Sequence, residues 1–95
     1  MQTNQEFNMN FSSALTELKQ GYRVQRSGWH GKGMFLFIVK GDAVQRAINE
    51  RYGNPDVPEL GMPVVDAIYM KTADSKLVPW LASQTDILAD DWVQC

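Results

Sequence analysis

The single cysteine, Cys95, limits the ways in which this short chain can be stabilised. Because it has no partner among the 95 residues, an internal disulfide framework and a cysteine-rich zinc site are both excluded. A chain of this length holds one hydrophobic core, and such a small domain buries only about 60–65% of its unfolded surface. We therefore expect one domain, with association of subunits as the remaining source of stability.

The composition is typical of a globular protein. Hydrophobic residues make up 44% of the chain and charged residues 21%, which argues against intrinsic disorder. No apolar run approaches the roughly 20 residues that cross a bilayer, and residues 1–10 lack the basic-then-apolar pattern of a signal peptide. We therefore expect a cytoplasmic protein with no membrane partner. The net charge of −2 also disfavours general binding to DNA or RNA.

Charge is distributed unevenly along the chain. Residues 19–51 carry seven basic and two acidic side chains, whereas residues 52–95 carry two basic and seven acidic ones. Such a division favours head-to-tail contacts between subunits or a local pocket for an anion. The alternative is that the opposite charges interleave in the folded domain.

An N-terminal helix is predicted by the first periodic segment. Asn10 is suited to cap its start and Gly21 to end it. Between them, apolar residues recur at helical spacing, at Phe11, Ala14, Leu15 and Leu18. Residues 1–9 are polar and unpatterned, so we expect a flexible arm before a single domain of residues 10–95.

Short β-strands are predicted along the rest of the chain, at residues 22–26, 34–39, 64–70, 77–81 and 92–94. The unbroken apolar run at 34–39 indicates a buried strand, and Pro79 restricts its strand to a sheet edge or a bulge. Ser83 and Asp86 are spaced to cap a short helical turn before the last strand.

A second, inserted helix is predicted in the middle of the chain. Asp42 and Gln45 have the spacing of a capping box, and the helix is expected to end at Tyr52. Residues 54–63 contain three prolines, which predict an irregular connection. The predicted fold class is therefore α+β: an N-terminal helix packed on an antiparallel β-sheet, with a short inserted helix, in an oligomer.

The sequence is poor in the groups that common catalytic mechanisms require. It contains one histidine, His30, which excludes a histidine-rich metal cluster. The glycines within residues 28–33 lack the Lys-Ser/Thr ending of the phosphate-binding loop of nucleotide hydrolases. Asp90 and Asp91 are adjacent, so an extended segment would direct their side chains to opposite faces. We expect no enzyme activity, no metal and no cofactor.

The glycine-rich loop instead carries groups suited to binding. Trp29 stands there beside Arg26, His30 and Lys32, a set in which a ring can stack on a base while cations meet phosphate. Such stacking contributes about 1–3 kcal/mol per base. The alternative is that Trp29 fills the core beneath a tight loop.

The polar segment 83–86 has two interpretations. Its side chains are suited to hydrogen-bonding a ribose or the edge of a base, or they simply cap a helix. Trp80 and Trp92 flank this segment, and tryptophans at such positions are more often core or interface residues than platforms for a ligand.

Two stretches of the chain resemble a known family. Residues 10–21, followed by GWHGKGMFL at 28–36, form the first stretch, and residues 70–92 form the second. Both are similar to small phage and prophage proteins that were first grouped as a domain of unknown function. These are now described as the second type of Thoeris anti-defence protein.

The resemblance implies a function that the residue patterns do not show. Proteins of this family bind a cyclic ADP-ribose-type signal, glycocyclic ADP-ribose, made by bacterial Toll/interleukin-receptor-domain sensors. They keep it from the Thoeris effector without cleaving it. The resemblance also implies a homotetramer with ligand pockets at subunit interfaces, and in some members a separate pocket for cyclic dinucleotides.

The resemblance also implies candidate ligand-binding residues. Trp29 would stack on adenine or ribose, and Arg26, Lys32 and Lys71 would contact the pyrophosphate. The pocket wall and its polar edge would be formed by Trp80, Ser83, Gln84, Thr85, Asp86 and Asp91.

One segment departs from the family pattern. Between residues 40 and 63, members commonly have a more extended, strand-like segment, where this chain has its predicted inserted helix. An insertion near an interface would reshape a pocket and alter ligand preference. Two other functions stay open from the sequence: a structural or protein-interaction module that binds no nucleotide, and an enzyme that degrades the same signal.

Overall fold

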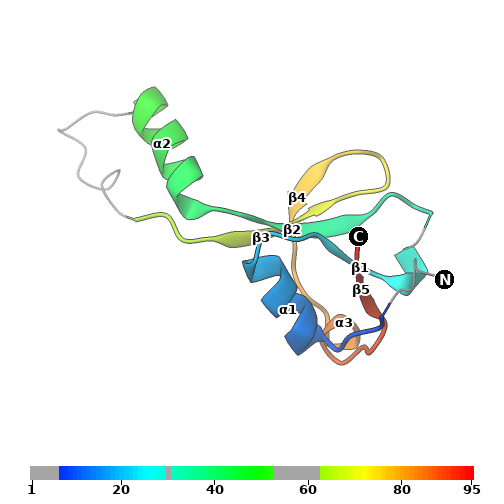
Figure 1. Ribbon diagram of the computed structural model, residues 1–95. Coiled ribbons are helices and arrows are strands. Elements are labelled where there is room, and N and C mark those ends of the chain that lie inside the picture. Colours follow the sequence, from blue (N-terminus) through cyan, green and yellow to red (C-terminus); the bar gives the residue numbers. More distant parts are fainter. Residues whose placement is uncertain (1–6, 30, 53–62) are drawn as a thin grey trace.

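A computed structural model describes residues 7–29, 31–52 and 63–95 of the chain (Figure 1). In order, the elements are α1 (Phe11–Lys19), β1 (Val24–Arg26), the 3-10 turn η1 (Ser27–Trp29), β2 (Phe35–Val39), α2 (Gly41–Tyr52), β3 (Ala67–Lys71), β4 (Leu77–Pro79), α3 (Gln84–Ile87) and β5 (Trp92–Gln94). In these ranges no helix is both long and apolar enough to cross a bilayer.

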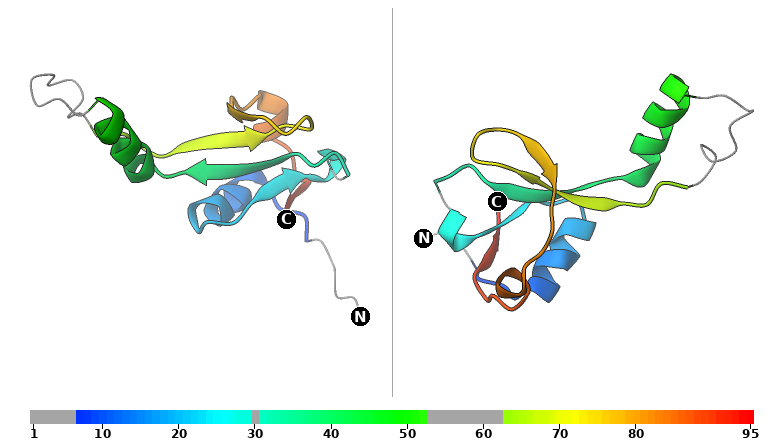
Figure 2. Two further views of the ribbon diagram at one scale, coloured as in Figure 1. Left: turned by 90° about the horizontal axis from the view of Figure 1, so that it is seen from above. Right: turned by 180° about the vertical axis from the view of Figure 1, so that it is seen from behind.

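The strands form one antiparallel sheet with the order β4-β3-β2-β1-β5. Helices α1 and α3 lie on the same side of this sheet, whereas α2 lies at its far end (Figures 1 and 2). The predicted α+β fold is therefore confirmed, with its N-terminal helix, antiparallel sheet and inserted helix. Pro79 ends β4 at the sheet edge, as its missing N–H group requires.

Helix α1 begins and ends as its sequence predicts. The side chain of Asn10 accepts a hydrogen bond of 2.9 Å from the backbone N–H of Ser13, which satisfies one of the free donors of the first turn. Gly21 follows the helix with a φ of +95°, a left-handed conformation that favours glycine. Ala14 and Leu18 form the buried face of the helix.

The core lies between α1 and the sheet. The buried side chains of this cluster are Ala14, Leu18, Val24, Leu36 and Trp92, and Val93 next to Trp92 is also buried. Because neighbouring residues of a strand face opposite sides, Leu36 meets α1 whereas Phe35 and Phe37 point to the side without a helix. The strand predicted at 34–39 is confirmed as β2, but its expected full burial is not: only Leu36 is fully buried and its neighbours are half-buried, since no helix of the described chain covers the second face.

The start of α2 differs from the prediction. The helix begins at Gly41, so Asp42 lies inside its first turn and cannot act as the N-cap of a capping box. Asp66, which precedes β3, takes that place: its carboxylate accepts hydrogen bonds from the Gly41 N–H at 2.7 Å and the Lys40 Nζ at 3.1 Å. The side chain of Gln45 instead accepts the N–H of Val64 at 2.9 Å. Asp66, which is distant in sequence, thus takes the place at the start of α2 that the sequence predicts for Asp42.

The sequence predicts two irregular segments, an arm at residues 1–9 and a connection at residues 54–63. Residues 1–6 of the predicted arm, and residues 54–62 of the predicted connection, lie outside the described residues. Met9, at the end of the arm, pairs with Trp92 through two backbone hydrogen bonds of 2.7 and 3.1 Å. The ordered domain therefore includes Met9.

Gly41 provides a test of how the sheet is joined to α2. A Cβ atom at this position would overlap the carbonyl oxygen of Val64 and lie 2.7 Å from its carbon, so the Gly41→Ala variant must shift backbone. We expect the free energy of unfolding to fall by about 1–3 kcal/mol, measured by urea denaturation. Gly28→Ala is the matched control, because a Cβ there meets nothing within 4 Å. Equal stability of the two variants would contradict the close approach of Gly41 to the backbone of Val64.

Candidate functional site

Trp92 is the centre of an aromatic cluster beneath α1. Its ring is fully buried, and its centroid lies 5.4 Å from Phe11, 5.5 Å from Trp29 and 6.0 Å from Trp80. Trp29 and Trp80 both meet it edge to face, at interplanar angles of 81° and 85°. Aromatic pairs in this arrangement contribute about 0.5–1.5 kcal/mol each beyond the area that they bury.

Trp29 and Trp80 differ from Trp92 in their exposure. Both are half-buried, so each has one part against the core and another part available to solvent. The two interpretations of Trp29 are therefore compatible, since it packs on the core and still presents part of its ring. Trp29 comes from η1 and Trp80 from the segment after β4, so the fold brings together two sequence-predicted site residues that are far apart in the chain.

Arg26, Asp86 and Asp91 form a charge network beside this cluster. The Nε atom of Arg26 donates to Asp91 at 2.9 Å, and its Nη1 atom donates to Asp86 at 3.0 Å. Asp91 also accepts a hydrogen bond of 3.1 Å from the hydroxyl of Ser27. The fold thus joins three of the sequence-predicted residues, from β1, from α3 and from the position just before β5.

The network changes the proton affinities of its members. Hydrogen bonds from Arg26, and more weakly from Ser27, lower the pKa of the Asp91 carboxyl below its usual 3.8, against the opposing effect of burial. The bond to Asp91 raises the pKa of Arg26 above its usual value. Asp91 therefore stays ionised at neutral pH, and it is poorly suited to act as a proton donor.

The polar segment after Trp80 forms a helix cap. Ser83 is the N-cap of α3, and its hydroxyl accepts the Asp86 N–H at 3.1 Å while the Asp86 carboxylate accepts the Ser83 N–H at 3.4 Å. The predicted capping box is confirmed. The hydroxyl of Thr85 lies 2.9 Å from that of Ser83, and Ser83, Gln84 and Thr85 are all exposed. These three residues remain able to meet a ligand at the rim of the aromatic cluster.

The two predicted lysines lie in different places: Lys71 on the face of the sheet opposite to the aromatic cluster, and Lys32 in the turn next to Trp29. Lys71 alternates along β3 with Met70, which packs on the core, so its side chain faces the opposite side of the sheet. Its Nζ atom donates to the carbonyl oxygen of Gly33 at 2.9 Å. Lys32 is exposed in the turn that follows η1, where its N–H donates to Trp29 at 2.9 Å. His30 lies outside the described residues.

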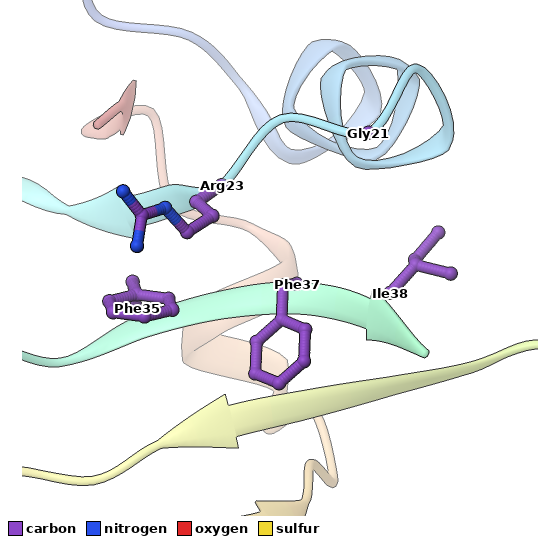
Figure 3. Close-up of a pocket in the computed structure, with 5 residues that line it drawn as sticks. All are labelled: Gly21, Arg23, Phe35, Phe37 and Ile38. Carbon is purple, nitrogen blue, oxygen red and sulfur yellow. The ribbon is translucent and has the colours of Figure 1, made fainter. Parts of the chain in front are cut away.

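A hollow of about 440 Å³ on the sheet was not predicted. Gly21, Arg23, Phe35, Phe37 and Ile38 line it, at the point where β1 diverges from β2 (Figure 3). The guanidinium of Arg23 lies over the ring of Phe35, 4.6 Å from its centroid. The sequence signal was the pair of phenylalanines two residues apart, which places both rings on one face of the strand.

The uneven charge of the sequence is balanced in part within one chain. Arg26 pairs with Asp86 and Asp91, and Lys40 pairs with Asp66, so ion pairs join the basic and acidic segments. The interleaved alternative is the one that the fold adopts at these positions. In the part of the chain that the structure describes, no three acidic, histidine or cysteine side chains are grouped to hold a metal ion.

With this geometry in place, the chain can be compared with known proteins. The profile of the Thoeris anti-defense 2-like domain matches residues 9–95. The chain belongs to the Thoeris anti-defense 2-like family. The match begins at Met9, which pairs with Trp92, so it covers the whole domain that surrounds the aromatic cluster.

A characterised member of the Thoeris anti-defense 2-like family is closely similar. The chain is 46% identical over 85 residues to Thoeris anti-defense 2 of Bacillus phage SP01. The alignment covers 88% of this chain and 91% of that relative. The family resemblance seen in the sequence is therefore confirmed.

The Asp91 carboxyl makes the stability of this Thoeris anti-defense 2-like domain depend on pH. Because folding lowers its pKa, its contribution is complete above about pH 5 and is lost as the pH falls through and below 3.8. We expect the stability difference between the natural protein and Asp91→Asn to shrink over this interval, measured by urea denaturation from pH 7 to pH 3.

Two other carboxyls with lowered pKa, Asp66 and Asp74, are present in both proteins and cancel in the comparison. A stability difference that stays constant from pH 7 to pH 3 would show that Asp91 has no lowered pKa.

Proposed function

We propose that this chain is a phage anti-defence protein that binds and sequesters a cyclic ADP-ribose-type immune signal, glycocyclic ADP-ribose, in the cytoplasm of the host bacterium. The observation that carries the proposal is the pair of half-buried tryptophans, Trp29 and Trp80, held against a fully buried Trp92 in a chain of this family. Cyclic dinucleotides are a second class of ligand that such a protein could take.

The aromatic cluster is suited to hold an adenine ring. Trp29 and Trp80 are fixed by their edge contacts with Trp92, so little side-chain freedom is lost when a base stacks on them. Beside them, Ser83, Gln84 and Thr85 provide exposed hydroxyl and amide groups for a ribose or the edge of a base.

The position of Lys71 favours a pocket shared between subunits. Lys71 lies on the face of the sheet opposite to the aromatic cluster, so one chain alone does not bring both to the same ligand. A neighbouring subunit would supply its Lys71 to the ligand, beside the Lys32 that follows Trp29 in the same chain. Such a shared pocket also excludes water, which strengthens charge-assisted contacts with the pyrophosphate and slows escape of the ligand.

The face of the sheet opposite α1 is suited to contact that neighbour. Its register places Phe35, Lys71 and Leu77 in one row across three strands, and Phe37, Tyr69 and Pro79 in the next. Leu77 is 60% exposed, and no helix of the described residues covers these rows. Because a single chain of this size has a small core, burial of the face in a homotetramer would add the missing apolar contact.

Sequestration requires affinity and no chemistry. Nanomolar binding corresponds to about −12 kcal/mol, which stacked rings and charge-assisted phosphate contacts can supply after the costs of ordering. The carboxylates of the network beside the aromatic cluster, Asp86 and Asp91, are both bound to Arg26. They are therefore poorly placed to activate water, and we expect the ligand to leave unaltered.

A protein-interaction module is the second candidate function. Apolar side chains around α3 are exposed, namely Leu81 at 91%, Leu88 at 75% and Ile87 at 46%. Such a surface is suited to contact another protein. A module of this kind would show no change of melting temperature with any cyclic nucleotide, whereas a stoichiometric ligand raises it.

Titration calorimetry with glycocyclic ADP-ribose tests the sponge function. We expect stoichiometric binding, and for Trp29→Ala an affinity about 5- to 150-fold weaker, because one stacked ring is lost. Tyr22→Ala removes an exposed aromatic residue outside the cluster and should bind normally. Trp29→Phe, which keeps a ring, should retain most of the affinity.

The fate of the ligand distinguishes the sponge from an enzyme. The complex is heated, the protein removed and the ligand analysed by mass spectrometry. Recovery of the intact ring in stoichiometric amount supports sequestration, whereas recovery of a linear product would establish a degradative enzyme. Absence of any heat of binding would contradict the proposed function itself.

The proposed subunit interface has its own test. Phe37→Lys places a charge on the uncovered face of the sheet next to Arg23, so we expect the homotetramer to dissociate into smaller species. Light scattering after size-exclusion chromatography measures the mass. Thr16→Lys, on the exposed face of α1, adds the same charge and should leave the mass unchanged. A tetramer in both variants would place the interface elsewhere.

A further inference from the structure

We infer that Arg26 is a positioning residue, which holds the two half-buried tryptophans in place through Asp91 and Asp86 and does not itself contact the phosphates. This inference rests on the proposed function, because it concerns the same binding site. It separates Arg26 from the lysines, whose side chains are exposed or reach the sheet surface.

Each of the three guanidinium nitrogens of Arg26 donates a hydrogen bond within the chain. Its Nε and Nη1 atoms donate to Asp91 at 2.9 Å and to Asp86 at 3.0 Å, and its Nη2 atom donates to the second oxygen of Asp91 at 3.5 Å. One positive charge thus faces two negative ones. The network has a net negative charge, which repels a phosphate rather than attracting it.

One arm of the network leads to Trp29. The backbone carbonyl of Asp91 accepts the Ser27 N–H at 2.9 Å, and its carboxylate accepts the Ser27 hydroxyl at 3.1 Å. Ser27 begins η1, the turn of which Trp29 is the last residue. Asp91 therefore fixes the turn from which the Trp29 ring reaches Trp92, and Arg26 fixes the carboxylate of Asp91.

The other arm leads to Trp80. The carboxylate of Asp86 binds Arg26 and caps α3 by accepting the Ser83 N–H, three residues after Trp80. Its backbone carbonyl accepts the indole N–H of Trp92 at 2.9 Å. Asp86 therefore joins the start of α3, the buried ring and Arg26. Both half-buried tryptophans are tied to the same guanidinium.

The two roles of Arg26 predict opposite effects of removing the Asp91 charge. If Arg26 contacted an anionic ligand, Asp91→Asn would free the guanidinium and remove a repelling charge, so binding would strengthen. If Arg26 acts by position, the same change loosens the η1 turn and binding weakens. The sign of the effect therefore decides between a contact and a positioning role.

The experiment is a double-mutant cycle of Arg26→Gln and Asp91→Asn, titrated with glycocyclic ADP-ribose in the full-length protein. We expect each single variant to bind roughly tenfold more weakly and the double variant no worse than either, because both break one network. Asp90→Asn is the matched control: it removes the same charge from the exposed neighbouring residue and should bind within about twofold of the natural protein.

Stronger binding by Asp91→Asn, or additive losses in the double variant, would overturn the inference. If Asp91→Asn fails to fold, Ser27→Ala replaces it, because it removes the hydroxyl contact with Asp91 and should weaken binding by about two- to fivefold. Unchanged binding by Ser27→Ala would then count against the network.

A second measurement does not depend on the ligand. The indole N–H signal of Trp29 in a nitrogen–proton correlation spectrum should shift alike in Arg26→Gln, Asp91→Asn and the double variant, and stay in place in Asp90→Asn. If the natural protein binds no cyclic nucleotide, the proposed function fails while these shifts still support the network. Unshifted signals would overturn the positioning role even where the ligand binds.

Discussion

The burial of Trp92 is the constraint on which the rest of the domain depends. Its ring is fully enclosed, its indole N–H is bound to the carbonyl of Asp86, and its backbone pairs with Met9 on one side and Arg26 on the other. A buried indole needs both apolar contacts and a partner for its N–H. These contacts bring the segments that carry Met9 and Trp92, near the two ends of the domain, next to α1 and β1.

Around this ring, the structural roles and the proposed binding roles fall on the same residues. Trp29 and Trp80 complete the core by contacting Trp92 and also present the aromatic surface at which a base can stack. The ion pairs of Arg26 hold the segments that carry them. A site built in this way is rigid before the ligand arrives, which favours tight binding because fewer groups must be ordered.

The sheet has two unlike faces, and their difference explains why a subunit partner is expected. One face is closed by α1 over Leu36 and the other carries Phe35 and Phe37 without a helix over them. Because Cys95 has no second cysteine in the chain to pair with, the homotetramer that we propose would be a further source of burial. This open face is therefore the surface at which we propose that subunits meet.

Local signals in the sequence determined much of the secondary structure. Asn10 and Gly21 bound the first helix, and Ser83 with Asp86 capped α3, because these contacts lie within a few residues of chain. The α+β class followed from hydrophobic periodicity, which reports the face of each element. The residues alone also showed the resemblance of two stretches to a known family, and this resemblance indicated Trp29 and Trp80 as candidate ligand-binding residues.

Only the tertiary structure decided which distant groups meet. Asp66, and not Asp42, provides the contact at the start of α2, and Arg26 pairs with Asp86 and Asp91 some sixty residues away. The sequence also could not tell that Phe35 and Phe37 face an uncovered side, since an unbroken apolar run has no alternation to read. Side-chain pairing and burial depend on long-range packing, which local patterns do not encode.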